Sequence, residues 1–221
     1  MDALEGGEDG RRRCAWGARD PLYRRYHDAE WGRPVTGDAA LFERACLEGF
    51  QSGLSWLTIL RKRENFRAAF QGFRPEAVAR FGPDERARLL GDAGIVRHAG
   101  KIDAAIANAA RALDLQREFG SLAAFFWAHE PPPDERPDAV TGEWIAANPF
   151  TPRSAALSAA LKRRGWRFVG PTTMHALMEA VGIVNDHAEG CWVREAVERE
   201  RAALRRPEGT SAARRALGLQ A

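Results

Sequence analysis

The stretch Asp92-Ala93-Gly94-Ile95-Val96-Arg97 separates two segments with helical patterns, a short one over residues 84–91 and a longer one from His98 to about Gln116. In the longer segment, apolar side chains recur every three or four residues, which is typical of one buried helix face. Two helices joined by a tight turn with a glycine form the layout of a helix-hairpin-helix element. In that element, the turn amides and the N-terminus of the second helix face a phosphate. Gly94 would equally suit an ordinary helix C-cap, and the second glycine usual in such hairpins is missing, so both interpretations stay open.

Most of the remaining chain also has helical periodicity. Asp38 and Ser55 can each cap a helix with an apolar face. Cys46 falls inside one of these apolar runs, so we expect it in the core rather than at a metal. The exceptions are a short strand candidate at residues 166–169 and a long loop rich in proline and glycine at residues 131–152. The pattern predicts an all-α fold.

Two thiols and two imidazoles form pairs near the two ends of the chain: Cys14 with His27, and His187 with Cys191. These are ligand types that a tetrahedral zinc ion prefers, and the i,i+4 spacing of the second pair would place both side chains on one helix face. One zinc bound by all four would join the two ends across roughly 160 intervening residues. The spacing lacks the dense Cys-x-x-Cys pattern of a zinc finger. Buried cysteines and hydrogen-bonded histidines explain the pairs equally well.

Three aromatic residues lie between or beside the first two of these candidate ligands. Trp16, Tyr23 and Tyr26 could be held in place by a bound metal and form a pocket on which a nucleic-acid base stacks. The alternative is a small hydrophobic cluster around the metal, with no ligand of its own.

Two further features follow along the chain. Glu48 ends an apolar helical run, where a carboxylate is either a surface residue or a buried acceptor with a function, because burying it without a partner is unfavourable. Gly53 and Leu54 then form an apolar tip just before the Ser55 cap. Such a tip can enter a base stack, or it can pack inward as a turn leucine.

Composition sets the remaining limits. The 221 residues, 45% of them hydrophobic, suit one soluble domain, and the net charge of +3 does not by itself indicate nucleic-acid binding. No apolar run approaches the ~18 residues of a membrane span. Residues 1–13 lack a signal-peptide core, so we interpret them as a disordered extension of a cytoplasmic protein. The tail at residues 193–221, rich in Arg, Glu and Ala, is either a solvated helix or frayed.

Taken together, these motifs resemble the bacterial 3-methyladenine DNA glycosylase I family. The resemblance keeps the family's order over about residues 13–192, and the body of the domain is accordingly assigned to residues 14–192. It is carried by Cys14-Ala-Trp16, Asp20-Pro-Leu-Tyr23, Tyr26-His-Asp-Ala-Glu-Trp-Gly32, Leu41-Phe-Glu43, Cys46-Leu-Glu-Gly49, Gly53-Leu-Ser-Trp56, Arg63-Glu-Asn65, Asp92-Ala-Gly-Ile95, Gly100-Lys-Ile102, Phe168-Val-Gly170 and Val184-Asn-Asp-His187.

The resemblance implies the fold of the helix-hairpin-helix glycosylase superfamily and one structural zinc ion. It implies hydrolysis of the N-glycosidic bond of 3-methyladenine in double-stranded DNA, on a base flipped out of the stack. The implied roles fall into three groups: Cys14, His27, His187 and Cys191 bind zinc; Trp16, Tyr23, Tyr26, Glu48 and Trp56 bind the base, with Glu48 also the catalytic candidate; Gly53, Leu54, Arg97, His98 and Lys101 contact DNA. Asp186 could orient an imidazole ligand from the second shell, or simply cap a helix.

One departure from the wider superfamily limits the mechanism. No Gly-Pro-Asp segment follows Lys101, so we expect a monofunctional hydrolase without lyase activity, acting as a monomer and without a membrane partner. The alternative is a zinc-stabilised module that binds damaged DNA without catalysis. A zinc hydrolase or deaminase is disfavoured, since the His-x-Glu and Pro-Cys-x-x-Cys stretches of that chemistry are absent from the sequence.

Overall fold

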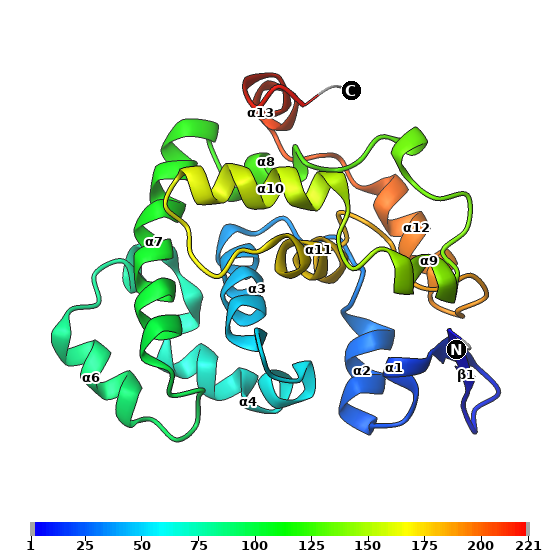
Figure 1. Ribbon diagram of the computed structural model, residues 1–221, viewed down its shortest axis with the longest axis horizontal. Coiled ribbons are helices and arrows are strands. Elements are labelled where there is room, and N and C mark those ends of the chain that lie inside the picture. Colours follow the sequence, from blue (N-terminus) through cyan, green and yellow to red (C-terminus); the bar gives the residue numbers. More distant parts are fainter. Residues whose placement is uncertain (1–2, 220–221) are drawn as a thin grey trace.

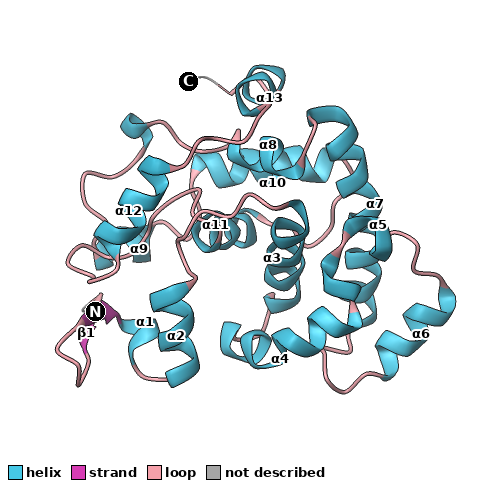
Figure 2. Ribbon diagram, turned by 180° about the vertical axis from the view of Figure 1, so that it is seen from behind, coloured by secondary structure: helices cyan, strands magenta, loops and turns pink. Residues whose placement is uncertain are grey.

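A computed structural model of the chain describes residues 3–219, and nearly all of its regular structure is helical (Figures 1 and 2). The all-α prediction is therefore confirmed. The elements in chain order are β1 (Leu4–Gly6), β2 (Arg12–Cys14), α1 (Ala15–Ala18), α2 (Pro21–Ala29), α3 (Asp38–Gln51), α4 (Trp56–Ala69), the 3-10 helix η1 (Gln71–Phe73), α5 (Pro75–Val78), α6 (Pro83–Gly91), α7 (Ala99–Phe119), α8 (Leu122–Trp127), η2 (Pro133–Glu135), α9 (Gly142–Ala147), α10 (Pro152–Arg163), α11 (Pro171–Ala180), α12 (Arg194–Ala203) and α13 (Thr210–Ala216). In the described part of the chain, no helix is long and apolar enough to cross a bilayer.

Helix α3 lies at the centre of the molecule, with α4, α7, α8 and α11 packed around it (Figure 1). Every residue from 41 to 50 is buried, and a helix with no solvated face belongs in the interior of a domain. Cys46 lies in this core, as the sequence analysis expected. The central position of α3 fixes Glu48, a residue near its C-terminal end, inside the protein.

A second, smaller hydrophobic cluster joins the two ends of the chain. Leu4, Tyr26 and Trp31 pack against Val193 and Val197. The N-terminal elements therefore lie beside the segment that leads into α12, on the right-hand side of Figure 1. This contact brings together the two Cys/His pairs that the sequence separates.

The N-terminal residues differ from the expectation of disorder. Residues 4–6 and 12–14 form an antiparallel hairpin in which Leu4 pairs with Cys14. Arg13 fixes this hairpin because its buried guanidinium donates to Asp9 and Asp28. Charge alone suggested a solvated segment, and the buried ion pairs reverse that interpretation. Residues 1 and 2 of the expected extension lie outside the described residues.

The strand candidate at residues 166–169 is not a strand. Asn108 on α7 takes the place of a strand neighbour, because its amide donates to the carbonyl of Arg167 at 3.0 Å and accepts from the Arg167 N–H at 2.9 Å. The Ser158 hydroxyl donates to the carbonyl of Val169 at 2.6 Å. Side chains thus satisfy a backbone that the β-prone sequence would otherwise pair with another strand.

Two capping and loop expectations also change. Ser55 caps α4 as predicted, but Gly37 occupies the N-cap position of α3, and the Asp38 carboxylate accepts from Gln116 and from the Ala123 N–H instead. The long loop at 131–152 contains η2 and α9. The described part of the tail, residues 193–219, is helical and packed: α12 buries Val197, and α13 buries Ala213.

Candidate active site

A cavity of about 540 Å³ opens between the N-terminal elements, α3, α9 and α11. All five base-binding residues expected from the sequence line it: Trp16, Tyr23, Tyr26, Glu48 and Trp56. Its wall is mostly apolar and aromatic, with carboxyl groups at a few points, which is the composition typical of a site for a flat organic ligand.

The aromatic rings of the cavity contact one another, Trp16 edge to face with two neighbours and Tyr26 at a tilt to Trp56. The Trp16 ring lies 5.5 Å from that of Tyr23 and 5.0 Å from that of Trp31, and Tyr26 lies 5.5 Å from Trp56. Trp16 remains 39% exposed, so one of its faces is available to a ligand.

Tyr23 has a structural task in addition to lining the cavity. Its hydroxyl accepts a hydrogen bond of 2.9 Å from the backbone N–H of Leu57, in the first turn of α4. This bond satisfies a donor that a helix start leaves free. Tyr23 therefore ties α2 to α4 across the cavity mouth, which qualifies the expectation that it serves only the ligand.

Glu48 is 4% exposed and lies at the inner end of the cavity wall. Among the described residues, none donates a hydrogen bond to its carboxyl, and the positive charge that acts on it comes from Arg44. Burial raises the pKa of Glu48 to about 8, because the interior solvates the charged form poorly. A buried carboxyl without a protein partner is a group prepared to accept a hydrogen bond from a ligand.

Three aromatic or acidic lining residues were not predicted as part of the cavity wall: Trp31, Glu179 and Asp186. Trp31 follows the aromatic run that carries Tyr23 and Tyr26, so the same pattern could have identified it. Glu179 and Asp186 come from the C-terminal half, and only the packing of α11 against α3 brings them to the cavity. No local signal distinguishes them.

The four candidate zinc ligands lie beside this cavity. Ligand atoms of Cys14, His27 and Cys191 all lie within 4.8 Å of one another. The ring of His187 is 4.9 Å from that of His27, and its buried Nε2 has no hydrogen-bond partner. Gly32 makes room for this ring: it has a φ of +82°, and a Cβ there would lie 2.7 Å from His187 Cε1.

The Nδ1 atoms of both imidazoles, His27 and His187, have hydrogen-bond partners. His27 Nδ1 lies 2.8 Å from a carboxylate oxygen of Asp28, and His187 Nδ1 lies 2.9 Å from the side-chain oxygen of Asn185. Such partners fix the tautomer in which Nε2 carries the lone pair for a metal. Burial lowers the pKa of His187 to about 4, which keeps the ring neutral. The group therefore fits a tetrahedral cation that prefers sulfur and nitrogen.

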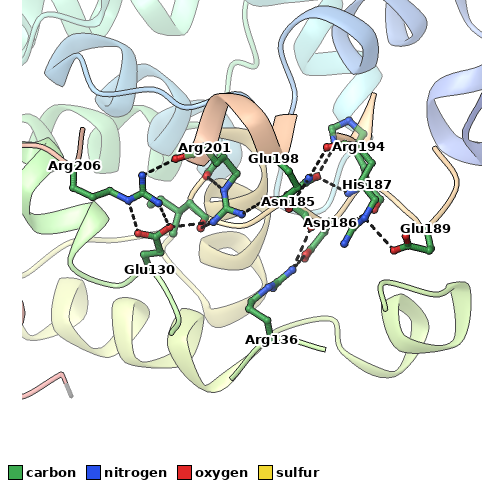
Figure 3. Close-up of polar contacts among 12 residues, drawn as sticks. Glu130, Arg136, Asn185, Asp186, His187, Glu189, Arg194, Glu198, Arg201 and Arg206 are labelled. Carbon is green, nitrogen blue, oxygen red and sulfur yellow. Dashed lines mark hydrogen bonds and ion pairs between the residues drawn. The ribbon is translucent and has the colours of Figure 1, made fainter. Parts of the chain in front are cut away.

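The residue that orients His187 is Asn185, not Asp186 as the sequence suggested. Figure 3 shows the network around it: the Asn185 amide donates to Glu198 at 2.9 Å and to the Arg194 carbonyl at 3.1 Å. Asp186 instead forms an ion pair with Arg136 (Figure 3). The second partner of Asp186 is His175, whose Nε2 lies 3.3 Å from its carboxylate.

The expected DNA contacts separate into two sets. Gly53 has a φ of +78°, which places Leu54 on a tight turn where it is 41% exposed. Arg97 and His98 are exposed at the start of α7, and His98 caps that helix by accepting from the Lys101 N–H. These four residues are accessible to a large ligand.

Lys101 does not point outward. Its side chain is buried, and its ammonium donates to the carbonyls of Phe50 and Ser52, at 2.8 and 2.5 Å. It stabilises the α3–α4 turn that carries Gly53 and Leu54, so the expected direct contact of Lys101 with DNA is corrected to a supporting role. A basic residue in a hairpin sequence suggested phosphate binding. In the structure, its ammonium instead donates to carbonyls that the end of α3 leaves without partners.

Gly94 is not a C-cap glycine, since Asp92 caps α6 and the φ of Gly94 is not positive. The turn instead docks on α4. A Cβ at Gly94 would lie 3.1 Å from Asn65, and Lys62 donates to the Ala93 carbonyl at 2.8 Å. The close approach to Asn65 explains why residue 94 is a glycine. The ammonium of Lys62 is engaged with this turn.

An aromatic cavity that ends on a buried carboxyl, beside an exposed turn and helix start, defines a protein that binds a flat base. The sequence model of the methyladenine glycosylase family matches residues 16–195, and the chain belongs to this family. It is 47% identical over 180 residues to DNA-3-methyladenine glycosylase 1 of Escherichia coli K12, covering 81% of this chain and 95% of that protein.

Solved structures give the same result. A crystal structure of a 3-methyladenine DNA glycosylase I matches with a TM-score of 0.75 at 46% identity, over 81% of this chain and 98% of that one. The Staphylococcus aureus enzyme, studied for its recognition of 3-methyladenine, matches with a TM-score of 0.74 at 34% identity, over 82% of this chain and 96% of that one. The family match ends near the start of α12, so α13 and most of α12 lie beyond it.

Proposed function

We propose that this protein hydrolyses the N-glycosidic bond of 3-methyladenine in DNA, releasing the base and leaving an abasic site. The observation that carries the proposal is the position of Glu48, a buried carboxyl without a hydrogen-bond partner among the described residues, at the wall of an aromatic cavity. The target atom cannot be reached inside a duplex, so the base must be flipped into the cavity.

The cavity suits an alkylated adenine in particular. Adenine alkylated at N3 carries a positive charge while attached to the sugar, so it is already a good leaving group and needs little acid catalysis. Rings such as Trp16, Tyr26 and Trp56 attract a desolvated cation by about 2 kcal/mol. Glu48 can accept a hydrogen bond from the exocyclic amine, which guanine does not offer at that position.

Double-stranded DNA would be held by the α6–α7 region. The α6–turn–α7 arrangement supports a helix-hairpin-helix contact, in which the start of α7, with Arg97 and His98, faces a phosphate. Leu54 on its exposed turn would fill the space left by the flipped nucleotide. No lysine lines the cavity among the described residues, and Lys101 is engaged with backbone carbonyls, which supports a monofunctional enzyme without a Schiff-base step.

One zinc ion would be held by Cys14, His27, His187 and Cys191. Four protein ligands leave no position for a reactive water, so its contribution is to stability rather than to chemistry. The ion would fix the N-terminal aromatic residues against the segment before α12. We further propose a monomer that acts in the cytoplasm.

Release of free base from methylated DNA, resolved by chromatography, tests the proposal. We expect release of 3-methyladenine with 7-methylguanine retained, and at least a tenfold slower single-turnover rate for Glu48→Gln with an unchanged circular dichroism spectrum. Glu195→Gln, the same change on a side chain that is 91% exposed on α12, is the matched control. DNA binding without base release by the zinc-loaded protein would favour a damage-binding module instead.

A further inference from the structure

The cavity contains a second carboxyl group that no part of the proposed mechanism has used. Glu179 on α11 lines the same cavity as Glu48, with its side chain 22% exposed. Among the described residues no arginine pairs with it; the nearest cation is His175, whose Nε2 lies 3.9 Å from its carboxylate.

This lack of an arginine partner is unusual for a shielded acid in this chain. Glu43 is held by Arg67 through hydrogen bonds of 2.8 to 3.0 Å. Glu130 receives hydrogen bonds from both Arg201 and Arg206 (Figure 3). Glu179 and Glu48 are exceptions, and both face the cavity.

The neighbours of Glu179 hold it in place without neutralising it. Ligand atoms of His175, Glu179 and Asp186 all lie within 4.8 Å of one another. His175 Nε2 lies 3.3 Å from Asp186, closer than to Glu179, and Asp186 also pairs with Arg136 (Figure 3). The nearer positive charges thus act on Asp186, and Glu179 has only the more distant His175 imidazole, at 3.9 Å, and no arginine as counterion.

The electrostatic consequence is a cavity wall to which, within residues 3–219, no arginine or lysine contributes. Burial, followed by the charges of Asp186 and Glu48, raises the pKa of Glu179 to about 8 against the opposing effect of His175. A cation entering the cavity would favour the ionised forms of Glu179 and Glu48 at once, because opposite charges at close range in a desolvated site attract strongly. A neutral ligand of the same shape gains nothing from this.

We propose that Glu179 is a second substrate-binding carboxyl that makes the cavity selective for cationic alkylated purines over neutral bases of the same shape. This inference rests on the proposed function, because it takes the flipped base as the occupant. Glu48 then accepts a hydrogen bond from the edge of the base, and Glu179 interacts with the positive charge of the base.

Binding of two small probes tests the inference without DNA. The permanent cation 3,9-dimethyladeninium and the neutral 9-methyladenine share the same ring, and each is titrated against the full-length protein by tryptophan fluorescence. Since a contact with a buried charge contributes enough to change affinity about tenfold, Glu179→Gln should weaken binding of the cation by about tenfold and of the neutral probe by less than about twofold. Glu179→Asp, which keeps the charge, should retain most of the preference, and Glu195→Gln should retain all of it.

The outcomes separate this inference from the proposed function. Equal loss for both probes, or an unchanged preference in Glu179→Gln while Glu48→Gln abolishes base release, would overturn the role of Glu179 and leave the glycosylase proposal standing. If the wild-type protein released no base but still preferred the cation, the proposed function would fail while the charge selection held. A Glu179→Asp variant as poor as Glu179→Gln in binding the cation would also count against the inference, since the negative charge would then not be what matters.

Discussion

Replacing Glu48 with glutamine should stabilise the protein at alkaline pH and leave its stability in mild acid almost unchanged. Burial raises the pKa of Glu48 from its ordinary 4.5 to about 8. Each unit of pKa corresponds to about 1.4 kcal/mol, so ionising this carboxyl costs the folded state at most about 4 to 5 kcal/mol relative to the unfolded chain.

The sign follows from the order of the two pKa values. Because the pKa of the folded state is the higher one, the folded protein keeps a proton that the unfolded chain releases between pH 4.5 and about pH 8. Stability therefore falls as the pH rises through this interval and becomes level above it. Glutamine does not ionise, so the variant lacks this contribution. Relaxation and water entry roughly halve such costs, leaving an advantage of about 2 kcal/mol near pH 9 and under about 0.5 kcal/mol near pH 5.

Urea unfolding followed by tryptophan fluorescence measures this directly. Wild-type protein, Glu48→Gln and the control Glu195→Gln are unfolded at about pH 5, 7 and 9, and the difference in the free energy of unfolding is compared at each pH. Titrating groups away from the substituted positions are common to all three proteins and cancel in the difference. The pKa of Glu179 does not cancel, because the charge of Glu48 contributes to raising it, but its change in Glu48→Gln acts in the same direction. A difference between Glu48→Gln and wild type that does not change with pH would refute the reasoning, because it would mean that Glu48 titrates alike in the folded and unfolded states.

Four further perturbations test the remaining assignments. Chelation of zinc should lower the melting temperature by roughly 10 °C, because a structural ion contributes several kcal/mol and each kcal/mol shifts the melting temperature by about 2–4 °C in a protein of this size; an unchanged melting curve would contradict the ligand assignment. Lys101→Met should lower the free energy of unfolding by about 2–3 kcal/mol, since a charged donor to two carbonyls is lost. Arg97→Ala should keep stability and reduce the slope of log binding constant against log salt concentration for DNA by about one. If Lys101→Met also reduced this slope, Lys101 would be a phosphate contact after all. Glu198→Ala should speed zinc release to a chromogenic chelator several-fold, because it removes a hydrogen bond to Asn185, and release at the wild-type rate would show that the network does not hold His187.

Local chemistry could be predicted from the sequence, and contacts between distant elements could not. The Ser55 cap, the buried Cys46 and the turn at Gly53 were all predicted in the right place. The exposure of Leu54 on that turn was left open by the sequence and is settled by the structure. The gathering of Trp16 and Tyr26 at one cavity also follows from their proximity in the chain. Such features depend mainly on residues that are close together in the sequence.

The features that were missed arise from the docking of helices. Lys101 has the sequence context of a surface cation, and only the end of α3 beside it explains why its charge turns inward. Asn108 likewise looks like a solvated helix residue until the segment after α10 brings Arg167 to it. Asp38 has the sequence context of a helix cap, and only α7 and α8 bring it the partners Gln116 and Ala123. Nothing in the sequence around Glu179 indicates a binding role. Its role follows from the lack of an arginine partner among the described residues, which only the structure shows.

The joining of the two chain ends also matters for how the protein is made. Tyr26 and Trp31 leave the ribosome roughly 160 residues before Cys191, Val193 and Val197, against which they pack. The N-terminal wall of the cavity must therefore wait until this later segment has been synthesised. A product of a premature stop codon or of cleavage before this segment would lack that support and could not close the pocket, so incomplete translation products would not compete with the finished protein for its ligand.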